Sequence, residues 1–221
     1  MFHVEQLILY MFPKEYDVIV VGAGHAGCEA AAAAANFASK TIKKTKKKQT
    51  IDKKTCNTAM GGIAKGQIVR EIDAMGGYSG IIADKSAIQF KMLNLSKGPA
   101  MWSPRTQNDR MLFAQEWRIA LENTKNLDFF QDMVKSLVIE NDTVKGVITS
   151  LGLTIKGKSV VLTNGTFLNG LIHVGDKQLG GGRMGEPRAF GITEQLVSLG
   201  FVAGRMKTGT PPRVDGRSLN Y

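Results

Sequence analysis

Three glycines near the N-terminus have a spacing that could bind the phosphates of a ligand. Gly22, Gly24 and Gly27 follow an apolar run that ends at Val21. In a turn between a buried strand and a helix, the first glycine permits a tight bend, the second lets the backbone approach a pyrophosphate, and the third lets the helix pack against the strand. The free N–H groups of the helix then point at the anion. The spacing therefore predicts a dinucleotide site.

This interpretation requires a strand before the glycines and a helix after them. Val18–Val21 has the unbroken β-branched character of a strand covered on both faces. Glu29–Ala35 is rich in alanine, the strongest helix former. Strand, turn and helix thus occur in the order that a dinucleotide-binding α/β unit needs.

The second strand of such a unit is harder to find. It should lie within Thr41–Ile51, but that segment contains five lysines. Because a strand buried on both faces cannot carry them without a large desolvation cost, we expect either a short, marginal strand or a loop. The acidic residue that usually contacts the ribose hydroxyls is also missing after Glu29, and Asp52 is a late substitute.

The pattern after Gly61 is mostly helical and then changes to a period of two. Predicted helices cover Gln67–Met75, Ser86–Leu95 and Gln107–Asn123, with a loop over Lys97–Arg105, and a later helix covers Ile192–Leu199. Predicted strands cover Leu127–Phe130, Val134–Glu140, Val144–Ser150, Leu151–Ile155 and Ser159–Thr163. Asn141-Asp142 and Gly157 are expected as turns, so these strands predict an antiparallel meander that returns to a buried strand ending near Gly165.

Length and composition limit the class of protein. The chain has 221 residues, of which 43% are hydrophobic, enough for one large domain or one and a half ordinary ones. No apolar run approaches the roughly 20 residues of a membrane span, and Met1–Met11 lacks the features of a signal peptide. The two cysteines, Cys28 and Cys56, exclude a disulfide framework and offer no paired metal spacing, so no metal is expected. A reducing, cytoplasmic setting fits best.

The net charge is concentrated in one segment. Of the formal charge of +10, most comes from Lys40–Lys54, which holds eight lysines and one aspartate. Such a low-complexity run is either a solvated loop, the reading we prefer, or a patch that binds nucleic acid. Net charge alone therefore does not establish a nucleic-acid partner.

Six segments in order carry a resemblance to a known family: Gly22–Gly27, Cys56–Gly66, Lys97–Ala100, Arg105–Arg110, Gly181–Arg183 and Lys207–Arg213. Together they resemble the MnmG (GidA) family, flavoproteins that install the 5-carboxymethylaminomethyl group on the wobble uridine (U34) of certain tRNAs. The resemblance runs from about Tyr16 to Tyr221 and covers only the N-terminal part of that family. It implies an N-terminal extension over residues 1–15 and an incomplete FAD-binding domain over 16–221.

The resemblance also implies a fold, cofactors and partners. The fold would be an FAD-binding, Rossmann-like parallel sheet of the glutathione-reductase type, with a β-meander and inserted helices. Residues implied in binding FAD are Gly22, Ala23, Gly24, His25, Ala26 and Gly27, together with Val134 near the adenine half and Ala189, where a flavin-contacting serine is expected. NADH, methylenetetrahydrofolate, tRNA and the MnmE GTPase are the family's further ligands and partners, and its full-length members form homodimers and heterotetramers.

Cys56 matches a family cysteine with a catalytic role. A thiolate that adds to a pyrimidine activates its C5, and Lys53, Lys54 and Lys65 nearby would favour the thiolate. The alternative is a small buried cysteine, which is how we interpret Cys28.

Several expectations remain open at this stage. The arginines of the later segments, with Lys207, are candidates for binding anions, or they belong to helix faces and surface turns: Arg105, Arg110, Arg183 and Arg213. The chain ends before the family's nicotinamide segment, second cysteine and C-terminal helices, so this portion alone is expected to be inactive. Alternative functions are a catalytically inactive flavin-binding remnant and a folate- and FAD-dependent tRNA uridine methyltransferase.

Overall fold

The computed structural model describes residues 15–37, 39–45, 59–207 and 214–220. Its main sheet has six strands in the order β6-β2-β1-β9-β8-β7. These strands are β1 (Tyr16–Val21), β2 (Thr41–Thr45), β6 (Leu127–Gln131), β7 (Val134–Glu140), β8 (Thr143–Thr149) and β9 (Thr154–Leu162). Strands β6, β2, β1 and β9 are parallel, while β9, β8 and β7 form an antiparallel meander. This confirms the predicted Rossmann-like α/β fold.

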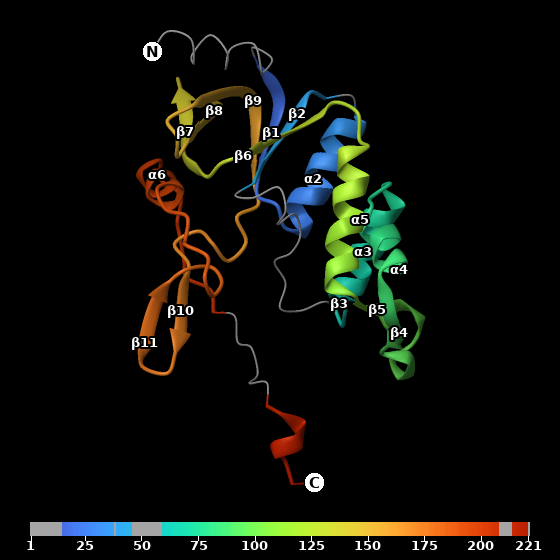
Figure 1. The fold of residues 1–221 in the computed structure, drawn as a ribbon. Helices are drawn as coiled ribbons and strands as arrows, with labels where there is room; N and C mark the ends of the chain where they lie inside the picture. The colour runs from blue at the N-terminus through green and yellow to red at the C-terminus, as the bar shows by residue number, and fades with distance from the viewer. Residues whose placement is uncertain (1–14, 38, 46–58, 208–213, 221) are drawn as a thin grey trace.

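Four helices lie together on one side of this sheet, to the right of it in Figure 1. They are α2 (His25–Asn36), α3 (Lys65–Ala74), α4 (Ser79–Lys85) and α5 (Arg110–Glu122). A buried cluster that includes Cys28, Ala32, Phe113 and Trp117 joins α2 to α5. A second cluster, on the strands and the meander, includes Ile19, Ile42, Val147 and Ile155. Burial of both faces explains why β1 has three consecutive buried residues at its end.

Strand β2 is present but short, which is the first of the two alternatives expected from the lysines of this segment. It pairs with β1 on one side and with β6 on the other, from Thr41 onward. Lys43 lies within it and is fully buried. The rest of the lysine run, residues 46–54, lies outside the described residues.

The predicted helix over Ser86–Leu95 is wrong. Residues Ala87–Leu93 form strand β4, which pairs with β5 (Ser103–Asn108), and β5 also pairs with β3 (Ala59–Gly61). Apolar side chains alternate along β4 at Ile88, Phe90 and Met92, which is the period of a strand. The short run was ambiguous because its composition also suits a helix.

The loop predicted over Lys97–Arg105 and the long helix after it also need correction. Single 3-10 turns cover Leu95–Lys97 and Pro99–Met101, and the chain then enters β5. Helix α5 begins only at Arg110, because the Asp109 side chain caps it by accepting from the N–H groups of Met111 and Leu112, each at 2.8 Å.

The meander is confirmed, with one change. Asn141 and Asp142 both have positive φ, 50° and 56°, as a two-residue type I′ hairpin requires. Gly157, by contrast, is not a turn, since Thr154–Leu162 is one continuous strand rather than two. A Cβ on Gly157 would lie 2.7 Å from the side chain of Ile19, so the glycine serves close packing between β9 and β1.

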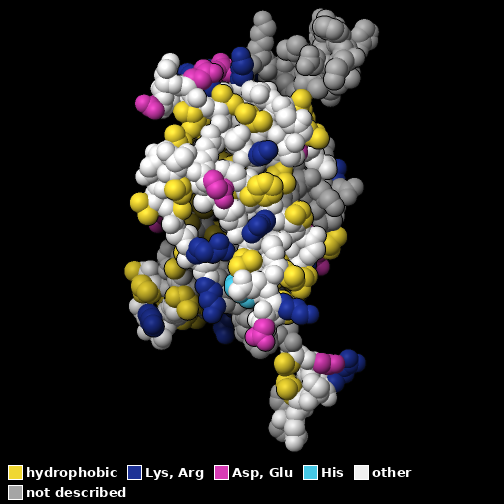
Figure 2. All heavy atoms as spheres, turned by 90° about the vertical axis from the view of Figure 1, so that its left-hand side faces the viewer, with side chains coloured by type: hydrophobic (Ala, Val, Ile, Leu, Met, Phe, Trp, Pro, Cys, Tyr) yellow, Lys and Arg dark blue, Asp and Glu magenta, His cyan; other side chains and the backbone are white. Residues whose placement is uncertain are grey.

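The part of the described chain after β9 lies to the left of the main sheet or below it in Figure 1, away from the four helices. It contains the hairpin of β10 (Leu171–Val174) and β11 (Lys177–Gly180), the predicted helix α6 (Ile192–Ser198) and a 3-10 turn at Gly216–Ser218 (Figure 1). The face of the molecule seen in Figure 2 includes this region, and its basic side chains are mixed with apolar and acidic ones. None of the described helices has the length and apolar character needed to span a bilayer.

Candidate functional site

The glycine turn lies between β1 and α2, as the sequence predicts. Gly24 is the N-cap residue of α2 and has extended backbone angles, φ −82° and ψ −176°. No side chain caps this helix, and its first turn contains no acidic residue. The positive end of the helix dipole is therefore not neutralised from within α2, which is the condition for binding an anion there.

The three glycines meet three different surroundings. A Cβ on Gly22, whose φ is +131°, would lie 2.4 Å from the carbonyl oxygen of Thr163, and one on Gly27 would lie 2.5 Å from that of Gly22. Among the described residues, apart from the two chain neighbours of Gly24, no atom lies within 4 Å of a Cβ built on Gly24. The outer glycines thus allow close packing, whereas the middle one leaves open space, which matches the roles that pyrophosphate binding assigns to them.

Thr163 is a site residue that the sequence interpretation missed. Its backbone N–H and its hydroxyl both donate to the Val21 carbonyl, at 2.8 and 2.9 Å. Its Oγ1 occupies the space where a Cβ of Gly22 or Gly27 would be, 2.3 and 2.7 Å away. Thr163 follows directly after β9, so the signal for it was the predicted strand that ends near Gly165. Gly165 itself has φ +59°, and a Cβ built on it would meet no atom within 4 Å in the part of the chain that the structure describes.

The residues between the three glycines are Ala23, His25 and Ala26, and their surroundings indicate packing rather than catalysis. Ala23 is buried and Ala26 is exposed. The His25 ring packs edge-on against Phe113 of α5, with ring centroids 5.3 Å apart. This contact supports a packing role for His25 beside the turn rather than a role as an acid or a base.

Glu29 does not serve as the missing ribose acid. Its carboxylate accepts from the backbone N–H groups of Tyr78 and Ser79, at 3.1 and 2.5 Å, and so holds the N-terminus of α4. Asp52 lies outside the described residues. Because no aspartate or glutamate lies between Glu29 and Asp52 in the sequence, the acid expected near the ribose has no counterpart there.

Val134 and Ala189 are both buried, but on different elements. Val134 is the first residue of β7 and belongs to the same apolar cluster as Val21. Ala189 lies in the segment before α6, where its N–H donates to the Phe167 carbonyl and its carbonyl accepts from the Asn169 N–H. With both backbone groups engaged and a methyl side chain, Ala189 can offer a flavin only van der Waals contact.

The side chains that could be reactive thiols are those of the two cysteines, Cys28 and Cys56. Cys56 lies outside the described residues, while Cys28 is fully buried in α2, as predicted for a small core cysteine. Within the described ranges there is no group of three His, Cys, Asp or Glu side chains placed to hold a metal ion.

The candidate anion-binding side chains are not gathered at the turn. Arg183 forms an ion pair with Glu186 three residues later, which favours the surface-turn interpretation. Arg105 is exposed on β5, Arg110 is the first residue of α5, and Lys207 is exposed near the end of the described chain. Arg213 lies outside the described residues.

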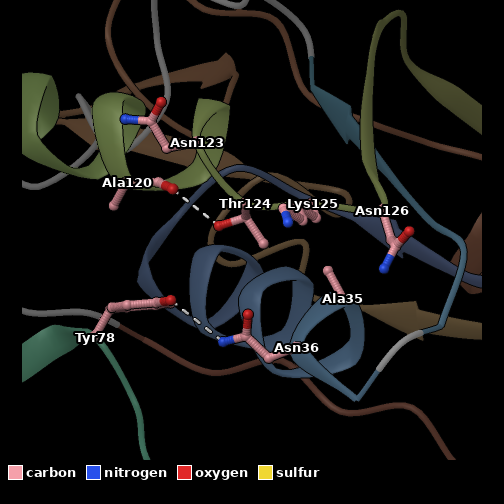
Figure 3. A pocket seen from close by; sticks show the side chains of 8 residues that line it. All are labelled: Ala35, Asn36, Tyr78, Ala120, Asn123, Thr124, Lys125 and Asn126. Atoms are coloured by element: carbon pink, nitrogen blue, oxygen red, sulfur yellow. Dashed lines mark hydrogen bonds between the residues drawn. The ribbon is translucent and has the colours of Figure 1, made fainter.

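A cavity of about 540 Å³ lies away from the turn, at the opposite end of α2 (Figure 3). It is lined by Ala35, Asn36, Tyr78, Ala120, Asn123, Thr124, Lys125 and Asn126. Within it Asn36 donates to the Tyr78 hydroxyl at 3.3 Å, and Thr124 donates to the Ala120 carbonyl at 2.8 Å. Since the three glycines lie before α2 or in its first turn and this cavity lies at its last residues, the two are separate features.

Comparison with known sequences decides the family. The family described as "Glucose inhibited division protein A" matches residues 17–221. The chain belongs to this GidA family. A relative from Flavobacterium psychrophilum, named tRNA uridine 5-carboxymethylaminomethyl modification enzyme MnmG, is 74% identical over 211 residues. A relative of the same name from Cytophaga hutchinsonii is 71% identical over 211 residues.

Solved GidA structures agree with this assignment. The Aquifex aeolicus GidA structure has a TM-score of 0.86 and 48% identity, with 92% of this chain and 34% of that chain covered. A GidA-related protein from Thermus thermophilus has a TM-score of 0.57 at 22% identity, covering 85% and 69% of the two chains, and so shares the fold. The match with each curated relative covers 96% of this chain and 34% of the relative, so the chain spans about a third of their length.

Proposed function

We propose that this chain is the FAD-binding portion of an enzyme that modifies the wobble uridine of tRNA. The observation that carries the proposal is the space at Gly24, which no described residue other than its chain neighbours enters to within 4 Å of a Cβ position. Gly24 stands at an uncapped helix N-terminus, between two glycines that are closely packed. The name of the relatives, a tRNA uridine 5-carboxymethylaminomethyl modification enzyme, supplies the reaction.

The chain's own residues have distinct roles in this proposal. Gly22 to Gly27 hold the pyrophosphate of FAD at the start of α2, where the dipole favours negative charge. Val134 contributes a backbone contact near the adenine half, and Ala189 packs against the flavin. When bound, the flavin supplies carrier chemistry for a one-carbon unit and for reducing equivalents.

Further parts of the proposal concern the whole enzyme. Cys56 acts as the nucleophile that activates the uridine, with methylenetetrahydrofolate as carbon donor and NADH as reductant. The MnmE GTPase is the partner, in a heterotetramer built on a homodimer, and the enzyme works in the cytoplasm. These roles come from the family resemblance and apply to an enzyme that includes the further segments of its relatives.

Flavin binding by the purified chain tests the first step. We expect quenching of FAD fluorescence on titration with the wild-type protein, and a large loss of affinity in Gly24→Val, because its side chain fills the space left for the pyrophosphate. Gly204→Val is the matched control, since a Cβ on Gly204 would likewise meet no atom of the described part of the chain within 4 Å, and Gly204 has no positive φ. Equal FAD affinity of the two variants would contradict the assignment of the turn.

Nucleoside analysis tests the reaction. A full-length relative that carries this chain's sequence over the matched region should form the aminomethyl-type uridine in tRNA, and Cys56→Ser should abolish it while FAD stays bound. A plain methyl group on the nucleoside would instead identify a methyltransferase. Unchanged modification in Cys56→Ser would remove the catalytic role of that residue.

A further inference from the structure

Lys43 is a charged residue that the proposed function does not use. It lies in the middle of β2, opposite Val20 of β1 and Phe129 of β6. Its exposed fraction is 0%, although lysine is among the residues least often buried. A charge in this position carries a desolvation cost that must be offset by a contact or used by a ligand.

The contact that Lys43 makes is with a thiol. Its Nζ lies 2.8 Å from Sγ of Cys28, which is itself fully buried. Among the described residues, no carboxylate lies within ion-pair distance of Lys43. In the described structure, the desolvation cost of the Lys43 charge is therefore offset by the thiol of Cys28, a weak hydrogen-bonding group, and not by a carboxylate of opposite charge.

Cys28 connects Lys43 to the glycine turn. The Cys28 N–H donates to the Gly24 carbonyl at 2.9 Å, which begins the hydrogen bonding of α2. The Cys28 thiol donates to the Ala23 carbonyl, with Sγ 3.9 Å from the oxygen. Lys43 thus contacts the Cys28 thiol, and the thiol contacts the backbone of the turn that the pyrophosphate is proposed to approach.

We propose that Lys43 supplies a buried positive charge to the anion site at Gly22–Gly27 and thereby raises its affinity for a pyrophosphate-containing ligand. The inference rests on the proposed function. A charge held in a medium of low dielectric acts on a nearby anion more strongly than a solvated one, and here it adds to the dipole of α2. The ligand anion in turn supplies the counter-charge that Lys43 lacks in the described structure.

Lys43→Met distinguishes a role in ligand binding from a role in folding, because stability should rise while affinity for FAD falls. Replacing a buried charge by an apolar side chain of similar length should raise the urea midpoint of the ligand-free protein. FAD affinity should fall about ten-fold, equivalent to about 1.4 kcal/mol. The fold-change should persist at high salt, since a buried charge is little screened.

Two matched variants serve as controls. Lys91→Met removes an exposed lysine on β4, and FAD affinity should not change. Cys28→Ala keeps the ammonium while removing the thiol, and the affinity should stay the same within about two-fold. A Cys28→Ala protein that binds FAD about ten-fold more tightly would mean that a thiolate cancels the charge of Lys43, which would overturn the inference.

Parallel titration with inorganic pyrophosphate keeps the inference distinct from the proposed function. If the wild-type chain binds pyrophosphate but not FAD, the flavin assignment fails, and Lys43 is then judged by whether Lys43→Met weakens pyrophosphate binding. Lys43→Met with unchanged affinity for the anion, or a wild-type chain that binds neither ligand, would overturn the role of Lys43.

Discussion

At the scale of single residues, the glycine turn combines one position that must stay open with two that must stay small. A Cβ on Gly24 would meet no atom of the other described residues within 4 Å, chain neighbours aside, whereas a Cβ on Gly22 or Gly27 would overlap backbone oxygens and the Thr163 hydroxyl. Ligand binding and packing are therefore assigned to different residues within a segment of six.

Alanine substitutions should separate these two demands. We expect Gly27→Ala to lower the free energy of unfolding by about 1–3 kcal/mol, because the new Cβ would lie 2.5 Å from the Gly22 carbonyl and overpacking carries a cost of that size. Gly24→Ala should lower it by no more than about 1 kcal/mol, the usual effect of losing a favourable N-cap residue. Urea unfolding of the ligand-free proteins measures both. A larger loss in Gly24→Ala than in Gly27→Ala would contradict the geometry.

A second residue-scale prediction concerns Tyr16, which is buried and donates its hydroxyl to Asp128 Oδ2 at 2.8 Å. Burial first, and then the Asp128 carboxylate, raise the pKa of Tyr16 well above its ordinary value. Since the folded-state pKa is raised, the stability linked to this group is present below about pH 10 and is lost as the pH rises toward the folded-state pKa.

Tyr16→Phe should therefore lower stability by about 1–3 kcal/mol at neutral pH, because it removes a hydrogen bond from a buried hydroxyl to a charged carboxylate. The variant should also show a smaller decline in stability above about pH 10 than the wild type. Chemical unfolding at a series of pH values checks both effects, and parallel alkaline curves for the two proteins would count against the hydrogen bond.

Sequence alone predicts the residues of the turn but not their partners. The spacing of Gly22, Gly24 and Gly27 identifies the site because each position requires a residue without a side chain, for a reason that lies within the turn itself. Thr163 and Glu29 could not be assigned in this way, because their partners lie far along the chain, at Val21 and at Tyr78. Such contacts depend on which elements the fold brings together.

At the scale of elements, α6 protects an edge of the main sheet. Strand β7 is the last strand in the sheet order, and the Gln195 side chain both accepts from the Leu137 N–H at 2.7 Å and donates to the Leu137 carbonyl at 2.8 Å. The amide of one helix residue thus pairs with the strand as a neighbouring strand would, which blocks pairing with another chain.

Removing this amide should weaken the attachment of α6. We expect Gln195→Ala to lower the free energy of unfolding by about 1–3 kcal/mol, since two backbone groups of β7 lose their partners, and to increase aggregation on heating. Unfolding curves and light scattering provide the measurements. Gln178→Ala, at an exposed position of β11, is the control and should behave as the wild type.

Prediction of helices, strands and turns from the sequence succeeded where local conformational preference is strong and failed where a short segment suits more than one conformation. The alanine-rich α2 and the Asn141-Asp142 hairpin follow from local conformational preference. Strand β4 was taken for a helix because its alternation covers only seven residues, too few to exclude a helix on composition. Gly157 was taken for a turn because the sequence does not reveal that Ile19 occupies the space beside it.

At the scale of the whole molecule, ligand binding should be visible as thermal stabilisation. A ligand present at 100 times its dissociation constant adds about 2.7 kcal/mol to a protein that binds it only when folded. For a chain of 221 residues we expect FAD at that excess to raise Tm by about 5–10 °C. Differential scanning calorimetry with and without FAD measures the shift, and riboflavin, which lacks the pyrophosphate, should give a much smaller one. Equal shifts would indicate binding elsewhere.

The interlocked packing of Thr163 with Gly22 and Gly27 has an evolutionary consequence. Thr163 is far from the two glycines in the sequence but shares one small volume with them, so a change at any one of the three positions alters the space available to the other two. In an alignment of descendants of this chain, we expect substitutions at position 163 to be restricted to small side chains wherever both glycines persist. Larger residues there should be found only together with changes at 22 or 27, in lineages that have given up the turn as an anion site.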